Sequence, residues 1–201
     1  MMTNNVGFLK KPGAVEPART PSVLKRVNAE VRARVERVKL LVLDVDGVLT
    51  DGRLFYHDDG TESKAFDVRD GHGIKMLGQA GIETAIISGR TCPSVEKRAT
   101  DLGITEVVQG VRDKVPSLEK LASEKGLMPE QMAFVGDDIV DLPVMNRVGF
   151  AVAVADASEH LFDKAHYVTL APGGRGAVRE VAELILGVQG LWSKVTAAYF
   201  A

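Results

Sequence analysis

The sequence predicts a three-layer α/β sandwich, in which helices cover both faces of a central parallel sheet. Short unbroken apolar runs recur along the chain, and Leu40–Leu43 is the clearest of them. Such runs suit strands that are buried on both faces. Between these runs lie segments in which apolar residues recur at helical spacing and which end at glycine. Because strand and helix alternate throughout, we expect a Rossmann-like arrangement of parallel strands with right-handed crossovers.

The composition is that of an ordinary globular protein. The chain has 201 residues and a formal net charge of −2, so we expect one well-buried core, and charge gives no reason to expect nucleic-acid or membrane partners. Its single cysteine, Cys92, rules out an internal disulfide and fits a reducing compartment. We find neither an apolar stretch of about 20 residues nor a secretory signal, so a cytoplasmic protein is expected.

Three parts are expected along the chain. Residues 1–21 contain three prolines and little apolar periodicity, and they are interpreted as a flexible extension. Residues 22–187 form the domain, and residues 188–201 form a C-terminal tail. At the start of the domain, valines at near-helical spacing predict one amphipathic helix from Ser22 to Arg37, with Ser22 as its N-cap.

A small β-hairpin flap is expected at about residues 52–68, where a simple strand–helix unit would continue directly into its helix. Two short strands, at 52–56 and 63–68, flank a turn-rich link. The flap carries Phe55, Tyr56 and Phe66, which suggests that it packs against another surface, a second subunit being one candidate. An ordinary edge hairpin is the alternative.

The other elements follow in alternation. We expect helices over 71–80, 94–102, 114–125, 142–147 and 177–186, and strands over 83–87, 106–109, 131–135, 149–154 and 167–170.

Polar residues stand at the ends of successive strands. Asp44 and Asp46 follow the first strand, Ser88 the second and Asp137 the fourth, while Lys114 opens the helix after the third. The carboxyl ends of parallel strands share one edge of the sheet, so these residues should converge there. Carboxylates, a hydroxyl and an ammonium suit a phosphate bound with a divalent cation, and oxygen ligands suit magnesium. Taken singly each residue has a simpler explanation, such as an acidic turn or an N-cap, but their order along the chain favours a site.

These motifs resemble those of the haloacid dehalogenase superfamily of phosphatases. The resemblance covers residues 38–186, and it is carried by Asp44-Val-Asp46-Gly-Val-Leu-Thr50, Ser88-Gly-Arg, Lys114 and Gly136-Asp137-Asp138-Ile-Val-Asp141. Within the superfamily, the chain is most similar to the phosphatases of 3-deoxy-D-manno-octulosonate 8-phosphate. That likeness rests on residues 49–52, 66–75 and 173–180, although His72 stands where that family pattern leads us to expect an aromatic residue.

The resemblance implies a mechanism. Asp44 would attack phosphorus to give an aspartyl-phosphate, and Asp46 would act as general acid and then as general base. The metal would be Mg²⁺, held by Asp44, Asp137 and the backbone carbonyl of Asp46.

It also implies the surroundings of that centre. Asp141 and Asp138 would orient the metal ligands, while Ser88, Lys114 and Gly89 would hold the phosphoryl group.

The same resemblance implies a homotetramer without a cap domain, in which hairpins associate and a neighbouring subunit covers each site. The substrate would be a small acidic sugar phosphate, used in lipopolysaccharide precursor synthesis. Arg69 and Arg175 are the candidates to bind its carboxylate, and a solvated surface arginine is the alternative for each.

Three other functions are alternatives. The first is a phosphatase for a nine-carbon acidic sugar phosphate of the sialic-acid type. The second is a receiver-type phosphoacceptor domain, in which an acidic pair ends the first strand and the phosphorylated Asp ends a middle strand. Here the Asp-x-Asp pair ends the first strand and a second acidic cluster ends the fourth, which disfavours this alternative. The third is an assembly module without catalytic activity. No motif residue is missing from the sequence, which disfavours this alternative.

Overall fold

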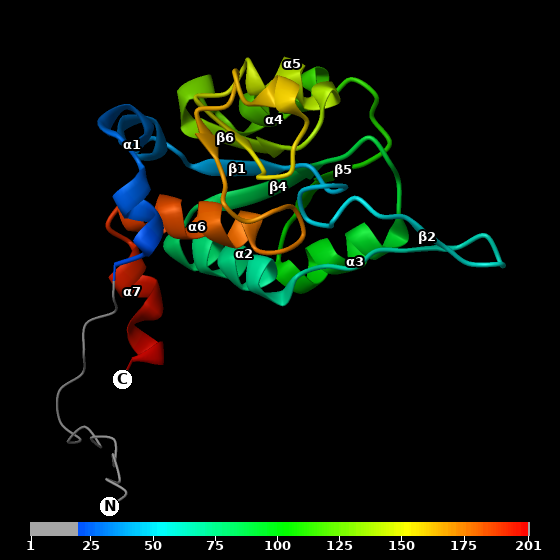
Figure 1. The fold of residues 1–201 in the computed structure, drawn as a ribbon, viewed down its shortest axis with the longest axis horizontal. Coiled ribbons are helices and arrows are strands. Elements are labelled where there is room, and N and C mark those ends of the chain that lie inside the picture. Colours follow the sequence, from blue (N-terminus) through cyan, green and yellow to red (C-terminus); the bar gives the residue numbers. More distant parts are fainter. Residues whose placement is uncertain (1–19, 201) are drawn as a thin grey trace, which may run out of the picture.

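The central sheet of the computed structural model has six parallel strands, and the structure describes residues 20–200 (Figure 1). Across the sheet the order is β5-β4-β1-β6-β7-β8. The strands are β1 (Leu40–Leu43), β4 (Glu83–Ile87), β5 (Glu106–Val108), β6 (Met132–Gly136), β7 (Phe150–Ala153) and β8 (Tyr167–Val168). The first strand therefore lies in the middle, paired in parallel with both β4 and β6. This arrangement confirms the predicted fold class.

Helices cover both faces of this sheet (Figure 1). One face carries α2 (Val68–Ala80), α3 (Pro93–Leu102) and α6 (Ala177–Val188), and the other carries α4 (Val115–Lys125) and α5 (Leu142–Met145). The strand β1 shows why both layers are needed. Its side chains alternate, so Leu41 and Leu43 join the core of the first layer while Leu40 and Val42 join that of the second. All four are fully buried, so β1 contributes to the cores on both faces of the sheet.

A two-stranded antiparallel hairpin, β2 (Phe55–Tyr56) and β3 (Glu62–Ser63), separates β1 from α2 and extends away from the sheet (Figure 1). Its arms are shorter than predicted, with two residues each. Phe55 and Tyr56 are 49% and 66% exposed. Within residues 20–200 no other domain is inserted at this point, in agreement with the predicted capless form.

The predicted single helix from Ser22 to Arg37 is wrong. The segment forms a 3-10 helix, Ser22–Arg26, and then α1 (Ala29–Val35), with extended backbone between them. The Oδ1 atom of Asn28 accepts a hydrogen bond of 2.9 Å from the Val31 amide, which caps a new helix in the middle of the valine pattern. Ser22 is the first residue of the 3-10 helix, and Pro21 occupies the N-cap position predicted for it. The predicted extension lies outside the described residues except for Thr20 and Pro21.

Two other differences from the prediction exceed two residues. Helix α2 begins at Val68 instead of residue 71, because the Asp67 side chain accepts a hydrogen bond of 2.7 Å from the Arg69 amide and caps it there. The C-terminal segment, for which we expected no element, forms α7 (Trp192–Thr196) and a 3-10 turn, and α7 packs against α2. The His72 ring there meets Tyr199 edge-on at 5.6 Å. The limits of the domain at residues 22 and 187 stay a prediction.

Among residues 20–200, no helix combines the length and the apolar character that crossing a membrane requires.

Candidate active site

The carboxyl ends of β1, β4 and β6 open into one cleft of about 310 Å³. Because β1 lies between β4 and β6, the residues that follow these three strands are brought together by the strand order itself. The residues predicted for phosphate and metal line this cleft: Asp44, Asp46, Ser88, Gly89, Lys114, Asp137 and Asp138. Asp141 is fully buried and reaches the same group of carboxylates.

An ammonium group lies among these carboxylates. The Nζ atom of Lys114 is 2.9 Å from Oδ1 of Asp44 and 2.7 Å from Oδ1 of Asp141, and the residue is only 4% exposed. Burial alone would lower the pKa of Lys114, but the charges of Asp44 and Asp141 outweigh it and raise the pKa. Lys114 is therefore a fixed positive charge at the floor of the cleft.

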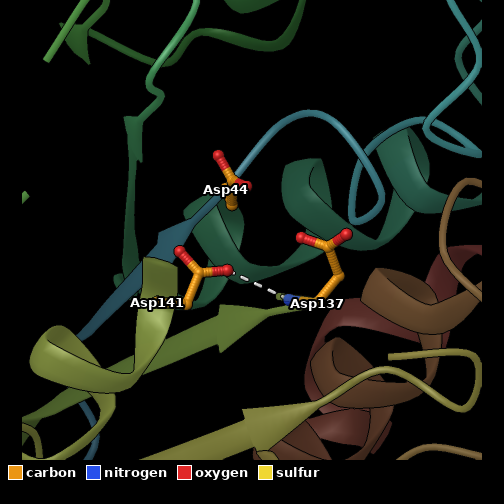
Figure 2. A group of neighbouring side chains, drawn as sticks. All are labelled: Asp44, Asp137 and Asp141. Carbon is orange, nitrogen blue, oxygen red and sulfur yellow. Dashed lines mark hydrogen bonds between the residues drawn. The ribbon is translucent and has the colours of Figure 1, made fainter. Parts of the chain in front are cut away.

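Both oxygens of Asp141 are engaged. Oδ1 accepts from Lys114, and Oδ2 accepts a hydrogen bond of 3.0 Å from the Asp137 amide (Figure 2). This buried carboxylate fixes the backbone that carries Asp137, as a residue supporting a metal ligand does. Asp138, next in the chain, is exposed, and its side chain caps the following turn by accepting a hydrogen bond of 2.7 Å from the Ile139 amide.

Negative charge exceeds positive charge in this cluster. Asp44, Asp137 and Asp141 each offer an oxygen within 4.8 Å of the others. Burial, followed by the charges of Asp44 and Asp141, raises the pKa of Asp137 to about 8. Burial and then the charge of Asp141 raise the pKa of Asp44 to about 6, against the opposing effect of Lys114. Among the described residues no lysine or arginine forms an ion pair with Asp137, so this donor set fits a hard divalent cation.

The turn after β1 is shaped to admit the Asp137 carboxylate. Gly47 has φ +87°, and a Cβ atom on it would lie 1.9 Å from Oδ2 of Asp137. Thr50, which is buried, accepts hydrogen bonds from the amides of Gly47 at 3.4 Å and Gly52 at 3.2 Å. Only glycine at position 47 permits both the backbone conformation and the close approach of Asp137.

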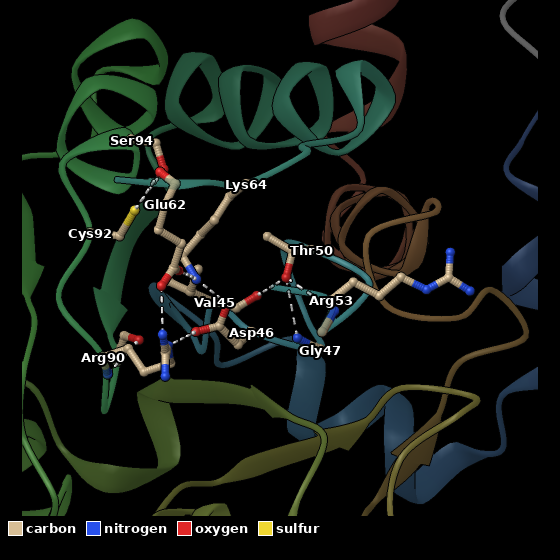
Figure 3. Close-up of polar contacts among 12 residues, drawn as sticks. Val45, Asp46, Gly47, Thr50, Arg53, Glu62, Lys64, Arg90, Cys92 and Ser94 are labelled. Atoms are coloured by element: carbon tan, nitrogen blue, oxygen red, sulfur yellow. Dashed lines mark hydrogen bonds and ion pairs between the residues drawn. The ribbon is translucent and has the colours of Figure 1, made fainter. Parts of the chain in front are cut away.

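The hairpin supplies a contact to Asp46 that sequence reasoning missed (Figure 3). Lys64, whose side chain is 1% exposed, forms ion pairs with Oδ1 of Asp46 and with Oε1 of Glu62. Glu62 also binds Arg90, at 2.5 Å, and Arg90 lies 3.7 Å from Oδ2 of Asp46. That Oδ2 atom is buried and has no hydrogen-bond partner among the described residues. The Glu62-Ser-Lys64 spacing could have indicated the pairing of Lys64 with Glu62, but it gives no sign of the contact with Asp46.

The two arginines predicted to bind a substrate carboxylate lie side by side but outside the cleft. Arg69 pairs with Asp67 at 2.7 Å and donates a hydrogen bond of 3.1 Å to the carbonyl of Arg175. Arg175 lies 3.5 Å from Asp51. Both line a separate groove beside the start of α6. Their predicted role in binding a substrate carboxylate stays a prediction.

Comparison with known proteins identifies the family. A model of haloacid dehalogenase-like hydrolases matches residues 102–178. The 3-deoxy-D-manno-octulosonate 8-phosphate phosphatase of Escherichia coli strain K12 is 50% identical over 164 residues, which make up 82% of this chain and 87% of that protein. The chain belongs to this phosphatase family.

Solved structures of the family superpose on the chain. The crystal structure of the phosphatase from Yersinia pestis has a TM-score of 0.81 and 49% identity, covering 82% of this chain and 89% of that one. The phosphatase from Moraxella catarrhalis, at 40% identity, has a TM-score of 0.83 and covers 85% of this chain and 98% of its own; it was crystallised with a magnesium ion, a phosphate ion and 3-deoxy-D-manno-octulosonate. In this family, therefore, one protein of closely similar fold holds metal, phosphate and sugar together.

The fit between Gly47 and Asp137 predicts the effect of one methyl group. In Gly47→Ala the new Cβ must displace the Asp137 carboxylate, so magnesium affinity should fall by about 10- to 100-fold, as when a supporting residue of a metal site is lost. Isothermal titration of the purified variant with Mg²⁺ measures this. Gly60→Ala is the matched control, because Gly60 has a similar φ of +82° with nothing within 4 Å of the added carbon. Equal affinity in Gly47→Ala and wild type would contradict the assignment of Asp137 to the metal.

Proposed function

We propose that this protein hydrolyses 3-deoxy-D-manno-octulosonate 8-phosphate to 3-deoxy-D-manno-octulosonate and phosphate, a step in making lipopolysaccharide precursors. The observation that carries the proposal is the 50% identity, over 82% of the chain, to phosphatases named for this substrate. The cleft supports it, since its buried lysine, serine and carboxylates suit a phosphate monoester.

In the first half of the reaction, a carboxylate oxygen of Asp44 attacks phosphorus in line with the ester bond. The P–O bond to the sugar breaks and an aspartyl-phosphate forms. Lys114, Ser88 and the amide of Gly89 lie around the same cleft and would hold the phosphoryl oxygens as negative charge moves onto them. The leaving sugar oxygen takes a proton from Asp46.

In the second half, Asp46 takes a proton from a water molecule, which attacks phosphorus and releases phosphate and free Asp44. The contacts of Asp46 suit both roles. Lys64 holds Oδ1. The buried Oδ2 lies 3.7 Å from Nε of Arg90 and has no hydrogen-bond partner in the described part of the chain, so it is the oxygen to which we assign the proton. Because the hairpin provides Lys64, it fixes the direction in which Asp46 faces.

Magnesium bound by the carboxylates of Asp44 and Asp137 and by the backbone carbonyl of Asp46 would withdraw charge from the phosphoryl oxygens and reduce their repulsion of the nucleophile. Asp141 supports this centre by joining Lys114 to the Asp137 amide, and Asp138 supports it by capping the turn that carries Asp141.

The proposal includes a homotetramer in which hairpins from different subunits associate. The exposed side chains of Phe55 and Tyr56 support it, since both lie on the projecting hairpin. Arg69 and Arg175 would then bind the substrate carboxylate at the cleft of a neighbouring subunit. Light scattering of the purified protein should give the mass of four chains, and the mass of one chain would reject this part of the proposal.

We also propose that the reaction takes place in the cytoplasm, in keeping with a chain that has one cysteine. Fractionation of cells that express the protein tests this, since the activity should then appear in the cytoplasmic fraction.

The decisive test of the proposed reaction is phosphate release from a panel of sugar phosphates in the presence of magnesium. We expect 3-deoxy-D-manno-octulosonate 8-phosphate to give the highest kcat/KM, and EDTA to abolish the activity. A higher kcat/KM for a nine-carbon acidic sugar phosphate would support the proposed phosphatase mechanism but show that the substrate is the nine-carbon sugar phosphate. No release from any member of the panel would favour an assembly role.

Asp44→Asn is the matched variant for this assay. The amide has nearly the same size as the carboxylate but is too poor a nucleophile, so turnover should be lost while circular dichroism shows a folded protein. An active Asn variant would refute the assignment of Asp44.

A further inference from the structure

Helix α6 starts without a side chain of its own to cap it. Its N-cap position is Gly176, with φ +107°, at the end of the glycine-rich loop 173–176. The amides in the first turn of a helix have no partner within that helix, and they require acceptors when they are buried.

The acceptor comes from another helix. Asp70, in the first turn of α2, is 1% exposed, and its Oδ2 accepts a hydrogen bond of 3.2 Å from the Gly176 amide while its Oδ1 accepts one of 2.7 Å from the Arg179 amide. Among the described residues Asp70 forms no ion pair. The hydrogen bonds from these two amides are therefore the main interactions that offset the cost of burying its carboxylate. The two helices touch here, since a Cβ atom on Gly73 would lie 3.2 Å from Cα of Arg179.

The loop that α6 follows rests directly on the catalytic turn. The Gly174 amide donates a hydrogen bond of 2.8 Å to the carbonyl of Val48. A Cβ on Gly173 would lie 1.6 Å from the carbonyl oxygen of Gly47, and a Cβ on Gly174 would lie 2.3 Å from the carbonyl carbon of Thr50. The two backbones are thus in contact with no side chain between them, so a shift of one displaces the other.

We propose that Asp70 is a positioning residue for the hydrolysis proposed above. By accepting hydrogen bonds from the first turn of α6, it keeps the glycine-rich loop in contact with the turn that carries Asp44 and Asp46. Asp70 does not line the cleft and does not touch the reacting atoms. Its influence passes along two hydrogen bonds and the loop between them: the Gly176 amide donates to the Asp70 carboxylate, and the Gly174 amide, two residues earlier, donates to the Val48 carbonyl.

This role differs from simple support of α6. The helix is also held by its apolar face, where Val178, Val181 and Ala182 are fully buried. Loss of the Asp70 carboxylate should therefore leave α6 packed but release its first turn and the loop before it. The consequence should appear in the catalytic turn, whose backbone the loop supports.

The test compares two variants at Asp70 with a control on α6. Asp70→Ala removes both acceptors, whereas Asp70→Asn keeps one carbonyl oxygen for the Arg179 amide. Val181→Ala removes buried methyl groups from the same helix without touching the cap, and it controls for lost stability. Each protein is measured for kcat and KM well below its melting temperature, and for hydrogen exchange in peptides that cover residues 44–52, without substrate.

In Asp70→Ala we expect faster exchange across residues 44–52 and a kcat about 10- to 100-fold lower, the usual scale for misplaced catalytic groups. KM should rise as well, because the released loop carries Arg175. Asp70→Asn should lie between this variant and wild type, and Val181→Ala should keep wild-type kcat and exchange in this turn. The proposal is overturned if Asp70→Ala loses melting temperature alone, or if Val181→Ala loosens residues 44–52 equally. Hydrogen exchange is measured without substrate. It therefore tests the positioning role of Asp70 even if the wild-type protein does not hydrolyse the sugar phosphate.

Discussion

The buried ion pairs of Lys114 with Asp44 and Asp141 are the interaction on which the site depends. A buried carboxylate without a partner is costly, and breaking a buried pair typically costs about 3–5 kcal/mol. Here one ammonium serves two carboxylates, and Asp141 extends the network to the Asp137 amide. The network spans the ends of β1 and β6 and the start of α4, so the sheet order must be correct before the charges can balance.

Contact between backbones is the second constraint. The turn after β1 has Asp137 on one side and the glycine-rich loop on the other, and glycines at 47, 173 and 174 leave no room for a methyl group. The hairpin closes a third side by bringing Lys64 to Asp46. Segments that are far apart in the sequence therefore fix the position of one short turn, and rigidity at this turn is what in-line attack on phosphorus requires.

The site residues at strand ends could be predicted from the sequence. Each apolar run followed by Asp44, Ser88 or Asp137 is visible in the sequence, and a parallel sheet brings the carboxyl ends of its strands together. The contact of Lys64 with Asp46 could not be predicted, because it depends on where the short hairpin places the residue that follows β3. The valine pattern hid the break at Asn28, since periodicity does not register a side chain that caps a new helix. Asp70 was missed for a similar reason: its partners are amides more than 100 residues away.

The central claim is that phosphorus passes from the sugar to Asp44 before it reaches water. Rapid acid quench of a single turnover, followed by mass spectrometry of the peptide that contains Asp44, measures this directly. The account predicts that a phosphoryl group appears on Asp44 and then decays as free phosphate rises. Free phosphate that forms at the rate of substrate loss, with no phosphorylated peptide at any time, would show direct attack by water and contradict it.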